Sequence, residues 1–390
     1  MQSKIIFLTI LILANLVISF EVASKEGQKK MNNMQKYVNP QLNSLLPNNL
    51  SAKGELALRI IFNQNEIPGN VVSMIMLDDS KVLIDYSEVF FAVDVYNNKV
   101  MGFQRKSLNA FLVSKDDQEF YTFASNLLLK MRFDSIQNFP PDSRYFVPGL
   151  SDYSILTTFI PKADTFIAGV QNLGNPKYPQ RSFSILEKTY MLTDSIWKVT
   201  FDGMVPAPPM SIDGNFVVSQ KDLISIVNSV GKVKEIKCEL LPISCSIGAD
   251  NLIYMLCRIK NKNFIKAMHF DGNVRWECLV SVAMPNQPPI VSKESMVFLI
   301  GSSKIEAFAS GEKKWEFQLT GNDEEHQSAS VSNDGMLLVS DCDKLLCINK
   351  AGEQVWAFNV AKGETIMTQP VLDSVGKVFI ATDKKILAIK

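Results

Sequence analysis

The sequence contains few of the residues that most metal and acid–base sites require. Of its 390 residues only two are histidine, His269 and His326. So small a number argues against His-rich metal sites and against most catalytic triads that use histidine. An excess of basic residues is also missing, since 40 Lys and Arg balance 40 Asp and Glu. A protein that binds nucleic acid through phosphate contacts needs such an excess, so we expect no nucleic-acid partner.

Cysteine occurs six times, but in no pattern typical of a metal or redox site. None of the six is adjacent to another and none forms a Cys-x-x-Cys motif. We therefore expect neither a zinc site nor a thioredoxin-type redox site. In an exported chain two alternatives stay open, free thiols or one disulfide. The candidates for that disulfide are Cys238, Cys245, Cys257 and Cys278.

A long apolar run occurs only at the N-terminus. Lys4 precedes the uncharged stretch IIFLTILILANLVISF, which covers residues 5–20. This pattern is typical of a secretory signal peptide, and we assign residues 1–24 to it, with cleavage after Ser19 or Ser24. An uncleaved membrane anchor is the alternative. The protein is thus predicted to be exported, either periplasmic or extracellular, and membrane-associated if the anchor is retained.

The rest of the chain divides into a polar segment and one domain. Residues 25–56 are rich in Lys, Asn and Gln, and we interpret them as a linker or tail. Residues 57–390 repeat with a period of about 40 residues. A tryptophan follows a glycine by four residues three times, and a fourth tryptophan lies two periods earlier. These residues are Gly272 and Trp276, Gly311 and Trp315, Gly352 and Trp356, and Trp197.

Two further signals recur in each unit. Small residues mark the centre of an apolar strand and, from Ser184 to Ala388, follow one another at steps of 40 to 42 residues. Another apolar strand comes before this one, and turns rich in Gly, Asn and Asp precede that earlier strand, as at Asn333-Asp334-Gly335. Where no tryptophan is present, Glu235, Met101 and Ile61 are predicted to occupy its position.

Each unit is therefore predicted to contain four short antiparallel strands, which is typical of a β-propeller blade. The repeat gives eight units. It is weak between residues 101 and 197, so a propeller of seven blades is the alternative. The last unit lacks its Trp-type strand, and residues 57–63 are a strand with no unit before them. We expect this N-terminal strand to complete the last blade beside residues 386–389 and so close an all-β, eight-bladed ring.

The motif of a small residue in an apolar strand, followed by Gly, three residues and Trp, resembles the tryptophan-docking repeat of the PQQ-like (quinoprotein dehydrogenase-like) propellers. The resemblance covers residues 57–390 and is strongest after residue 180. It implies that Trp197, Trp276, Trp315 and Trp356 pack between adjacent blades. It also implies two functional branches, quinone-dependent dehydrogenases and non-enzymatic propellers.

The residues favour the non-enzymatic branch. The dehydrogenases of this family hold their quinone with adjacent cysteines, a tryptophan floor and a bound Ca²⁺. Here no cysteines are adjacent, and all four tryptophans occupy docking positions. We therefore predict no enzyme activity, no cofactor and no metal site. PQQ and Ca²⁺ belong only to the alternative of a quinoprotein dehydrogenase. A further alternative is an extracellular ligand-binding propeller.

The predicted function is that of a monomeric protein-binding scaffold in the cell envelope. The non-enzymatic branch includes the eight-bladed periplasmic propeller of the outer-membrane β-barrel assembly machinery, so we expect envelope proteins as partners. The segment QNLGNPKYPQ, residues 171–180, is an insertion in the third unit, and loops on propeller faces carry recognition. Its candidate contact residues are Gln171, Asn172, Asn175 and Tyr178.

Overall fold

The computed structural model describes most of the chain from residue 49 onward. The described residues are 49–61, 71–78, 81–86, 89–94, 97, 99–104, 113–116, 119–124, 127–132, 143–146, 154–161, 165–172, 180–187, 195–202, 215–220, 223–228, 230–238, 241–282, 287–320 and 327–390. The predicted signal and nearly all of the predicted tail lie outside them. Among the described residues no helix is long and apolar enough to cross a membrane.

The described strands form eight separate antiparallel sheets, each made mainly from consecutive strands. The first three sheets are β2 (Val71–Asp78), β3 (Lys81–Tyr86), β4 (Val89–Asp94) and β5 (Lys99–Gln104); β6 (Val113–Asp116), β7 (Glu119–Ala124), β8 (Leu127–Arg132) and β9 (Ser143–Phe146); and β10 (Ser154–Pro161), β11 (Thr165–Asn172), β12 (Gln180–Glu187) and β13 (Ser195–Asp202).

The fourth sheet has three described strands and the next three have four. They are β14 (Phe216–Ser219), β15 (Leu223–Val227) and β16 (Val233–Lys237); β17 (Leu241–Ile247), β18 (Ile253–Ile259), β19 (Lys262–Met268) and β20 (Val274–Val280); β21 (Ile290–Val291), β22 (Val297–Ile300), β23 (Lys304–Ala309) and β24 (Glu312–Gln318); and β25 (Ser328–Val331), β26 (Leu337–Asp341), β27 (Lys344–Ile348) and β28 (Gln354–Asn359).

The last sheet joins the two ends of the described chain. Its strands are β29 (Val371–Leu372), β30 (Val378–Ala381), β31 (Lys385–Ile389) and β1 (Leu56–Ile61). β1 pairs antiparallel with β31, from Leu56 opposite Ile389 to Ile61 opposite Lys385. The N-terminal strand therefore takes the outer position that a consecutive fourth strand holds in the other four-stranded sheets.

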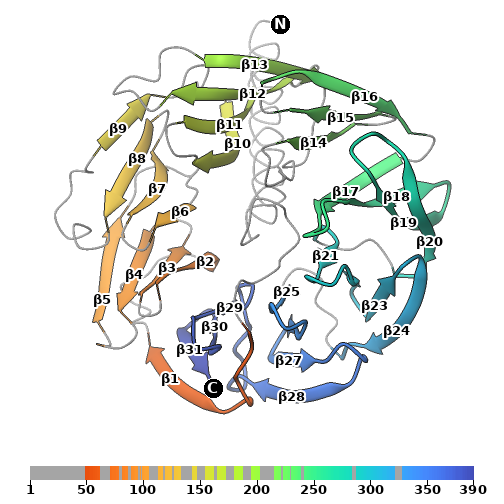
Figure 1. Ribbon diagram of the computed structural model, residues 1–390. Helices are drawn as coiled ribbons and strands as arrows, with labels where there is room; N and C mark the ends of the chain where they lie inside the picture. The colour runs from red at the N-terminus through yellow and green to blue at the C-terminus, as the bar shows by residue number, and fades with distance from the viewer. Residues whose placement is uncertain are drawn as a thin grey trace, which may run out of the picture.

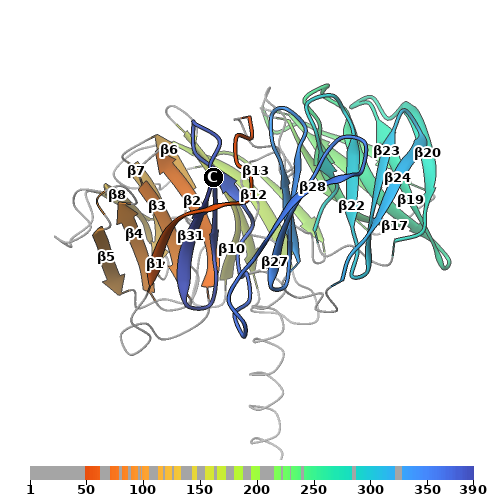
Figure 2. The same ribbon diagram turned by 90° about the horizontal axis from the view of Figure 1, so that it is seen from below.

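Figure 1 shows the sheets arranged around a common centre, with the first strand of each sheet innermost and the last outermost. Seen from the side, they form a disc (Figure 2). The inner strands of several neighbouring sheets contact one another, as β2 does with β6 and β17 with β21. This is the architecture of a β-propeller, so the predicted all-β fold built from four-stranded sheets is confirmed.

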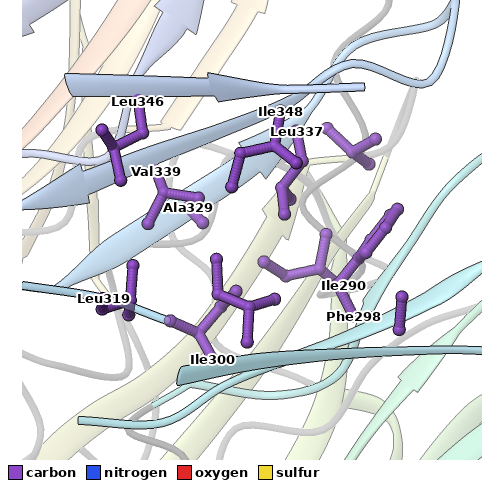
Figure 3. Packing of buried hydrophobic residues seen from close by; sticks show 12 residues of the cluster. Ile290, Phe298, Ile300, Leu319, Ala329, Leu337, Val339, Leu346 and Ile348 are labelled. Carbon is purple, nitrogen blue, oxygen red and sulfur yellow. The ribbon is translucent and has the colours of Figure 1, made fainter. Parts of the chain in front are cut away.

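Hydrophobic side chains hold neighbouring sheets together. β14, the first described strand of its sheet, and the second strands β22, β26 and β30 are buried at every residue. They are nearly continuous apolar runs because both of their faces pack against other sheets. Figure 3 shows one such interface, where Phe298 and Ile300 of β22 meet Leu337 and Val339 of β26. Each fully buried side chain of this size contributes about 1.5–3 kcal/mol to folding.

The outer strands alternate between half-buried and exposed residues. In β24 and β28 the inward positions are Trp315 with Phe317, and Trp356 with Phe358. A β-bulge at the residue before each tryptophan shifts the ladder, so that Trp315 pairs with Ala307 and Trp356 with Cys347. The small residues of the sequence repeat thus lie directly opposite these tryptophans, where a larger side chain would compete with the indole ring for the same space.

Candidate functional site

The predicted partner loop connects β11 and β12. Gln171 and Asn172 are the last two residues of β11, and Asn172 pairs with Gln180 at the start of β12. Both therefore belong to the ladder, and the turn is shorter than the sequence indicated. Asn175 and Tyr178 lie outside the described residues.

The β11–β12 hairpin is longer than the corresponding hairpins of later sheets. Both strands contain eight residues and pair along their whole length. The second strands β22 and β30, by comparison, contain four residues each. A difference of this size corresponds to roughly 13 Å of strand. The described residues of the insertion, Gln171, Asn172 and Gln180, are therefore paired at the end of a long hairpin.

Two tryptophans pack directly on glycines of the following sheet. A Cβ atom added at Gly311 would lie 3.0 Å from Cβ of Trp276, and one added at Gly352 would lie 2.7 Å from Cγ of Trp315. Both glycines also have positive φ, +82° and +85° respectively. Glycine is thus favoured at these positions for two reasons, the backbone conformation and the close approach of the indole ring.

The indole N–H groups differ in their partners. Trp315 Nε1 donates a hydrogen bond to the backbone oxygen of Lys350, 2.8 Å away in the following sheet. Trp356 Nε1 is buried and has no hydrogen-bond partner among the described residues. Trp197 lies in β13 opposite Ile185, and its side chain lies outside what the structure describes.

The residue that packs on Gly272 is Ile236, whereas the sequence placed Glu235 in the tryptophan position. An added Cβ at Gly272 would lie 3.2 Å from Cδ1 of Ile236. Glu235 is exposed and pairs with Ser225 in a ladder that lacks the bulge of the Trp strands. Without that extra residue the alternation is displaced by one position, so the side chain after Glu235 faces inward.

A fourth docking glycine, Gly54, lies before β1. An added Cβ at Gly54, which has φ +87°, would lie 3.2 Å from Cβ of Trp356. Leu58 follows Gly54 by four residues and pairs with Ala388, with a register shift just before it as in the Trp strands. Leu58, and not Ile61, therefore holds the tryptophan position. The spacing of Gly54 and Leu58 is present in the sequence, but without a tryptophan at the second position it did not indicate a docking pair.

The segment before β1 lies on the turns of the last two sheets. Leu50 N donates to Asp334 Oδ1 at 3.0 Å, and Ser51 N donates to the Gly376 backbone oxygen at 3.0 Å. Ala52 is buried in the cluster between these sheets, at 7% exposure. Residues 49–52, which belong to the predicted linker or tail, thus contact the last two sheets.

Backbone hydrogen bonds continue this attachment along the sheet. Glu55 N donates to the Lys390 oxygen at 3.0 Å, and Lys390 N donates to the Glu55 oxygen at 2.8 Å. Residues 49–61 are therefore held mainly by main-chain groups, first on turns and then as an added strand. Main-chain recognition of this kind depends little on side-chain identity.

A periodic lysine begins the third strand of three sheets and binds the crossover from the preceding sheet. Lys304 Nζ lies 2.6 Å from Ser281 Oγ, and Lys344 Nζ lies 3.2 Å from Thr320 Oγ1. Lys385 is buried and forms an ion pair with Glu364, at 2.7 Å from Oε1. No sequence pattern indicated these contacts, because the lysines follow ordinary tight turns, where charged residues are common.

Glu306 is a buried carboxylate in the same region. Its Oε2 accepts hydrogen bonds from Ser281 N at 2.9 Å and Val282 N at 3.1 Å, and Lys313 Nζ lies 3.3 Å from Oε1. Burial alone would raise the pKa of Glu306, but the hydrogen bonds from Ser281 and Lys313 hold the pKa below its ordinary value. The ionised carboxylate of Glu306 therefore holds the segment that connects β20 to β21, which belong to neighbouring sheets.

The cysteines and His269 show no arrangement for chemistry. All six cysteines are free, so the disulfide alternative is wrong for this structure. Burial raises the pKa of Cys245 to about 11 and the pKa of Cys347 to about 12, which keeps both thiols protonated. His269 is exposed beside the turn that ends at Gly272. Within the described ranges no group of three acidic, Cys or His side chains is placed to hold a metal ion.

Comparisons with known proteins agree with the fold. No family model and no curated protein sequence matches the chain. Hsv2 from Kluyveromyces lactis is 11% identical over 75% of this chain and 100% of its own, with a TM-score of 0.51. A eukaryotic initiation factor is 11% identical over 79% of this chain and 91% of its own, with a TM-score of 0.50.

Virginiamycin B lyase from Staphylococcus aureus is also similar, with 13% identity, 85% of this chain and 97% of its own covered, and a TM-score of 0.45. Identities this low concern the fold alone. The β-propeller is thus supported by solved structures as well as by the sheet topology. The resemblance to PQQ-like repeats stays a prediction that rests on the residues of the repeat.

Proposed function

We propose that the protein is an exported, non-catalytic propeller that binds other proteins in the cell envelope. The observation that carries this proposal is the capture of residues 49–61. The propeller binds this extended segment through main-chain hydrogen bonds to Gly376 and Lys390 and through strand pairing with β31. A fold that binds an extended segment of its own chain in this way has the chemistry to bind one from a partner.

The proposal includes a closed ring of eight blades. Its support comes from both ends of the chain. Met74, Val82 and Ile84 of the first consecutive sheet pack in one cluster with Phe379 and Ala388 of the last sheet. β1 adds the fourth strand to the last sheet, and Gly54, just before β1, packs on Trp356 of the sheet that precedes it. Closure would leave each outer strand on a rigid rim, which favours presentation of fixed surfaces to a partner.

The long β11–β12 hairpin is the second candidate contact. We propose that it extends beyond its neighbours on the propeller face and that the turn 173–179 meets the partner. These residues, LGNPKYP, include two prolines, one asparagine, one glycine, one lysine and one tyrosine. Such a composition provides polar contacts and one aromatic anchor, and tyrosine is enriched in protein interfaces.

In-cell photo-crosslinking tests this function. A crosslinking residue is placed at Asn172, and in a control protein at Leu279, which is 55% exposed on β20. Mass spectrometry then identifies the attached proteins. We expect envelope proteins to be captured from Asn172 and few from Leu279. If neither position yields a partner, the scaffold proposal is wrong.

A loop replacement separates binding from folding. Residues 173–179 are replaced by a short Gly-Ser turn, which keeps the β11–β12 ladder intact. We expect loss of the crosslinked partner with an unchanged thermal midpoint. Capture at the wild-type level would contradict the assignment of the loop. The dehydrogenase alternative is checked on the same protein, because an increase of its thermal midpoint with PQQ and Ca²⁺ would support that enzyme instead.

A further inference from the structure

The exposed apolar side chains are divided unevenly between the two faces of the disc. The strands of each sheet are antiparallel and follow one another from the centre to the rim. The turns after the first and third strands of a sheet therefore lie on one face of the disc, which we call the turn face. The hairpins between second and third strands lie on the other, the hairpin face.

Among the described residues eight large apolar side chains are exposed, and six of them lie on the turn face. Four are at the start of an outer strand and two are in turns, namely Leu56, Val233, Val274, Val355, Val230 and Val375. The other two, Ile259 and Leu279, lie near the ends of β18 and β20 on the hairpin face. The outer strands form the rim in Figure 1, so most of the six follow the edge of the turn face.

The fold does not require apolar side chains at these positions. Leu56, Val233 and Val274 each follow a glycine of the repeat by two residues. Lys313 holds the same place after Gly311, so a charged residue is accepted there. An apolar side chain that stays exposed adds nothing to the core by burial. Its recurrence on one face indicates a surface that something apolar covers.

Two of the valines lie beside exposed basic side chains. Lys232 and Lys234 flank Val233. Arg275 follows Val274 in the next sheet. Long basic side chains can keep their charge at the phosphates of a bilayer while neighbouring apolar side chains enter the acyl boundary. This combination fits a lipid surface better than an apolar protein surface, where the charges would lose water without gaining phosphates.

Acidic residues limit the electrostatic part of such a contact. Glu235 and Asp271 are exposed in the same two turn regions, and Lys234 Nζ donates to the Asp271 backbone oxygen at 3.1 Å. The positive charge is therefore partly balanced. We expect the contact to depend mainly on the insertion of apolar side chains and only weakly on salt.

The attachment of the N-terminal chain selects a bilayer as the occupant. Leu50 N donates to Asp334 Oδ1, and Ser51 N donates to the Gly376 backbone oxygen. Asp334 and Gly376 belong to turns between first and second strands, so the preceding chain joins the propeller on the turn face. That chain contains the uncharged apolar run of residues 5–20. A run that is apolar enough to enter a membrane is thus joined to the face that carries most of the exposed apolar side chains.

We propose that the turn face lies on a lipid bilayer, with residues 5–20 retained as the anchor and Val230, Val233 and Val274 in the headgroup region. The hairpin face then points away from the membrane, so the end of the β11–β12 hairpin is directed towards partners in the envelope. The inference rests on the proposed export of the chain and adds an orientation to it. It does not depend on the identity of a protein partner.

Quenching by brominated lipids measures which face contacts the bilayer. A fluorescent amino acid is incorporated at Val274 in one protein and at Leu279 in another. The two positions lie near opposite ends of β20, separated by roughly 17 Å of strand. Each full chain is reconstituted in vesicles of phosphatidylcholine and phosphatidylglycerol that are brominated in the acyl chains.

Interfacial side chains enter the acyl boundary by about 5–10 Å, so we expect quenching about threefold or more stronger at Val274 than at Leu279. Equal quenching at the two positions is the result for a propeller held only by a flexible anchor, and it would overturn the proposal. Stronger quenching at Leu279 would overturn it as well, because the hairpin face would then contact the lipid.

Charge on the rim provides a second test. Val230→Asp and Val233→Asp together, in the chain labelled at Val274, bring two carboxylates to the lipid surface. We expect the quenching to fall to the level found at Leu279. The matched control is Ile259→Asp with Asn261→Asp, which adds the same charge to the hairpin face and should leave the quenching unchanged.

All four substituted side chains are exposed, so the thermal midpoint should stay the same in both double variants. Quenching that survives Val230→Asp with Val233→Asp would overturn the proposal. Crosslinking from Asn172 in the same variant reports the proposed function separately. Equal quenching at the two labelled positions, together with envelope proteins captured from Asn172, would reject the membrane contact and leave the binding function in place.

Discussion

The contact between Trp315 and Gly352 gives a quantitative prediction. Replacing Gly352 by alanine has two costs that the structure separates. The backbone at φ +85° is unfavourable for an L-residue by about 1–2 kcal/mol. The new Cβ would also lie 2.7 Å from two atoms of the indole ring, which cannot yield without moving the sheet. Overpacking of this kind costs about 1–3 kcal/mol, so the total is about 2–5 kcal/mol.

Gly363 provides the matched control. It has φ +78°, but an added Cβ would have no atom within 4 Å. Gly363→Ala should therefore cost only the backbone part, about 1–2 kcal/mol. The difference between the two alanine variants isolates the docking contact with the tryptophan.

Denaturant unfolding followed by circular dichroism measures both variants. A second comparison in a Trp315→Leu background removes the large ring, and there the excess cost of Gly352→Ala should fall by about 1–3 kcal/mol. If Gly352→Ala and Gly363→Ala cost the same in the wild-type background, the close approach of the indole ring does not restrict this position, and the reasoning fails.

Three further predictions concern contacts between neighbouring sheets. Trp315→Phe loses the hydrogen bond to Lys350, whereas Trp356→Phe removes a buried donor that has no partner. We therefore expect the first to destabilise the protein by about 1–3 kcal/mol more than the second in denaturant unfolding; equal losses would contradict this. Gly54→Ala should expose residues 49–61 to limited proteolysis, since the new Cβ would lie 3.2 Å from the Trp356 ring system; an unchanged cleavage rate would count against the docking role. Glu306 has a lowered pKa, so its contribution to stability is present above its ordinary pKa and is lost as the pH falls through the folded value. In Glu306→Gln the free energy of unfolding should therefore fall less as the pH is lowered. If it falls as steeply as in the wild-type protein, other carboxylates cause the loss of stability at acid pH.

The repeat made most of the fold predictable. Four strands per period, the small residues and the glycine turns are local signals that recur, so errors in one unit are corrected by the others. The positions of Trp276 and Trp315 on Gly311 and Gly352 follow from the same period. Prediction was poorer where one unit departs from it, as at Glu235, because a single missing bulge displaces the inward face by one residue.

The candidate site was less predictable. Gln171 and Asn172 were expected in a loop, but pairing with β12 extends the ladder over both. No local pattern shows how far a hairpin continues, since the partner strand supplies the hydrogen bonds. The lysine contacts to the crossovers, such as Lys304 with Ser281, likewise connect residues of different repeat units.

The sequence by itself determined the class of fold, the period of about 40 residues and the strands that each period contains, because alternation and turn chemistry act between near neighbours. The tertiary structure decided which residues face one another across the seams. Gly54 meets Trp356 only because the first described strand pairs with the last, and residues 50–52 lie on the turns of the final sheets through main-chain hydrogen bonds. Contacts between residues about 300 positions apart depend on the arrangement of whole sheets, and no local pattern encodes them.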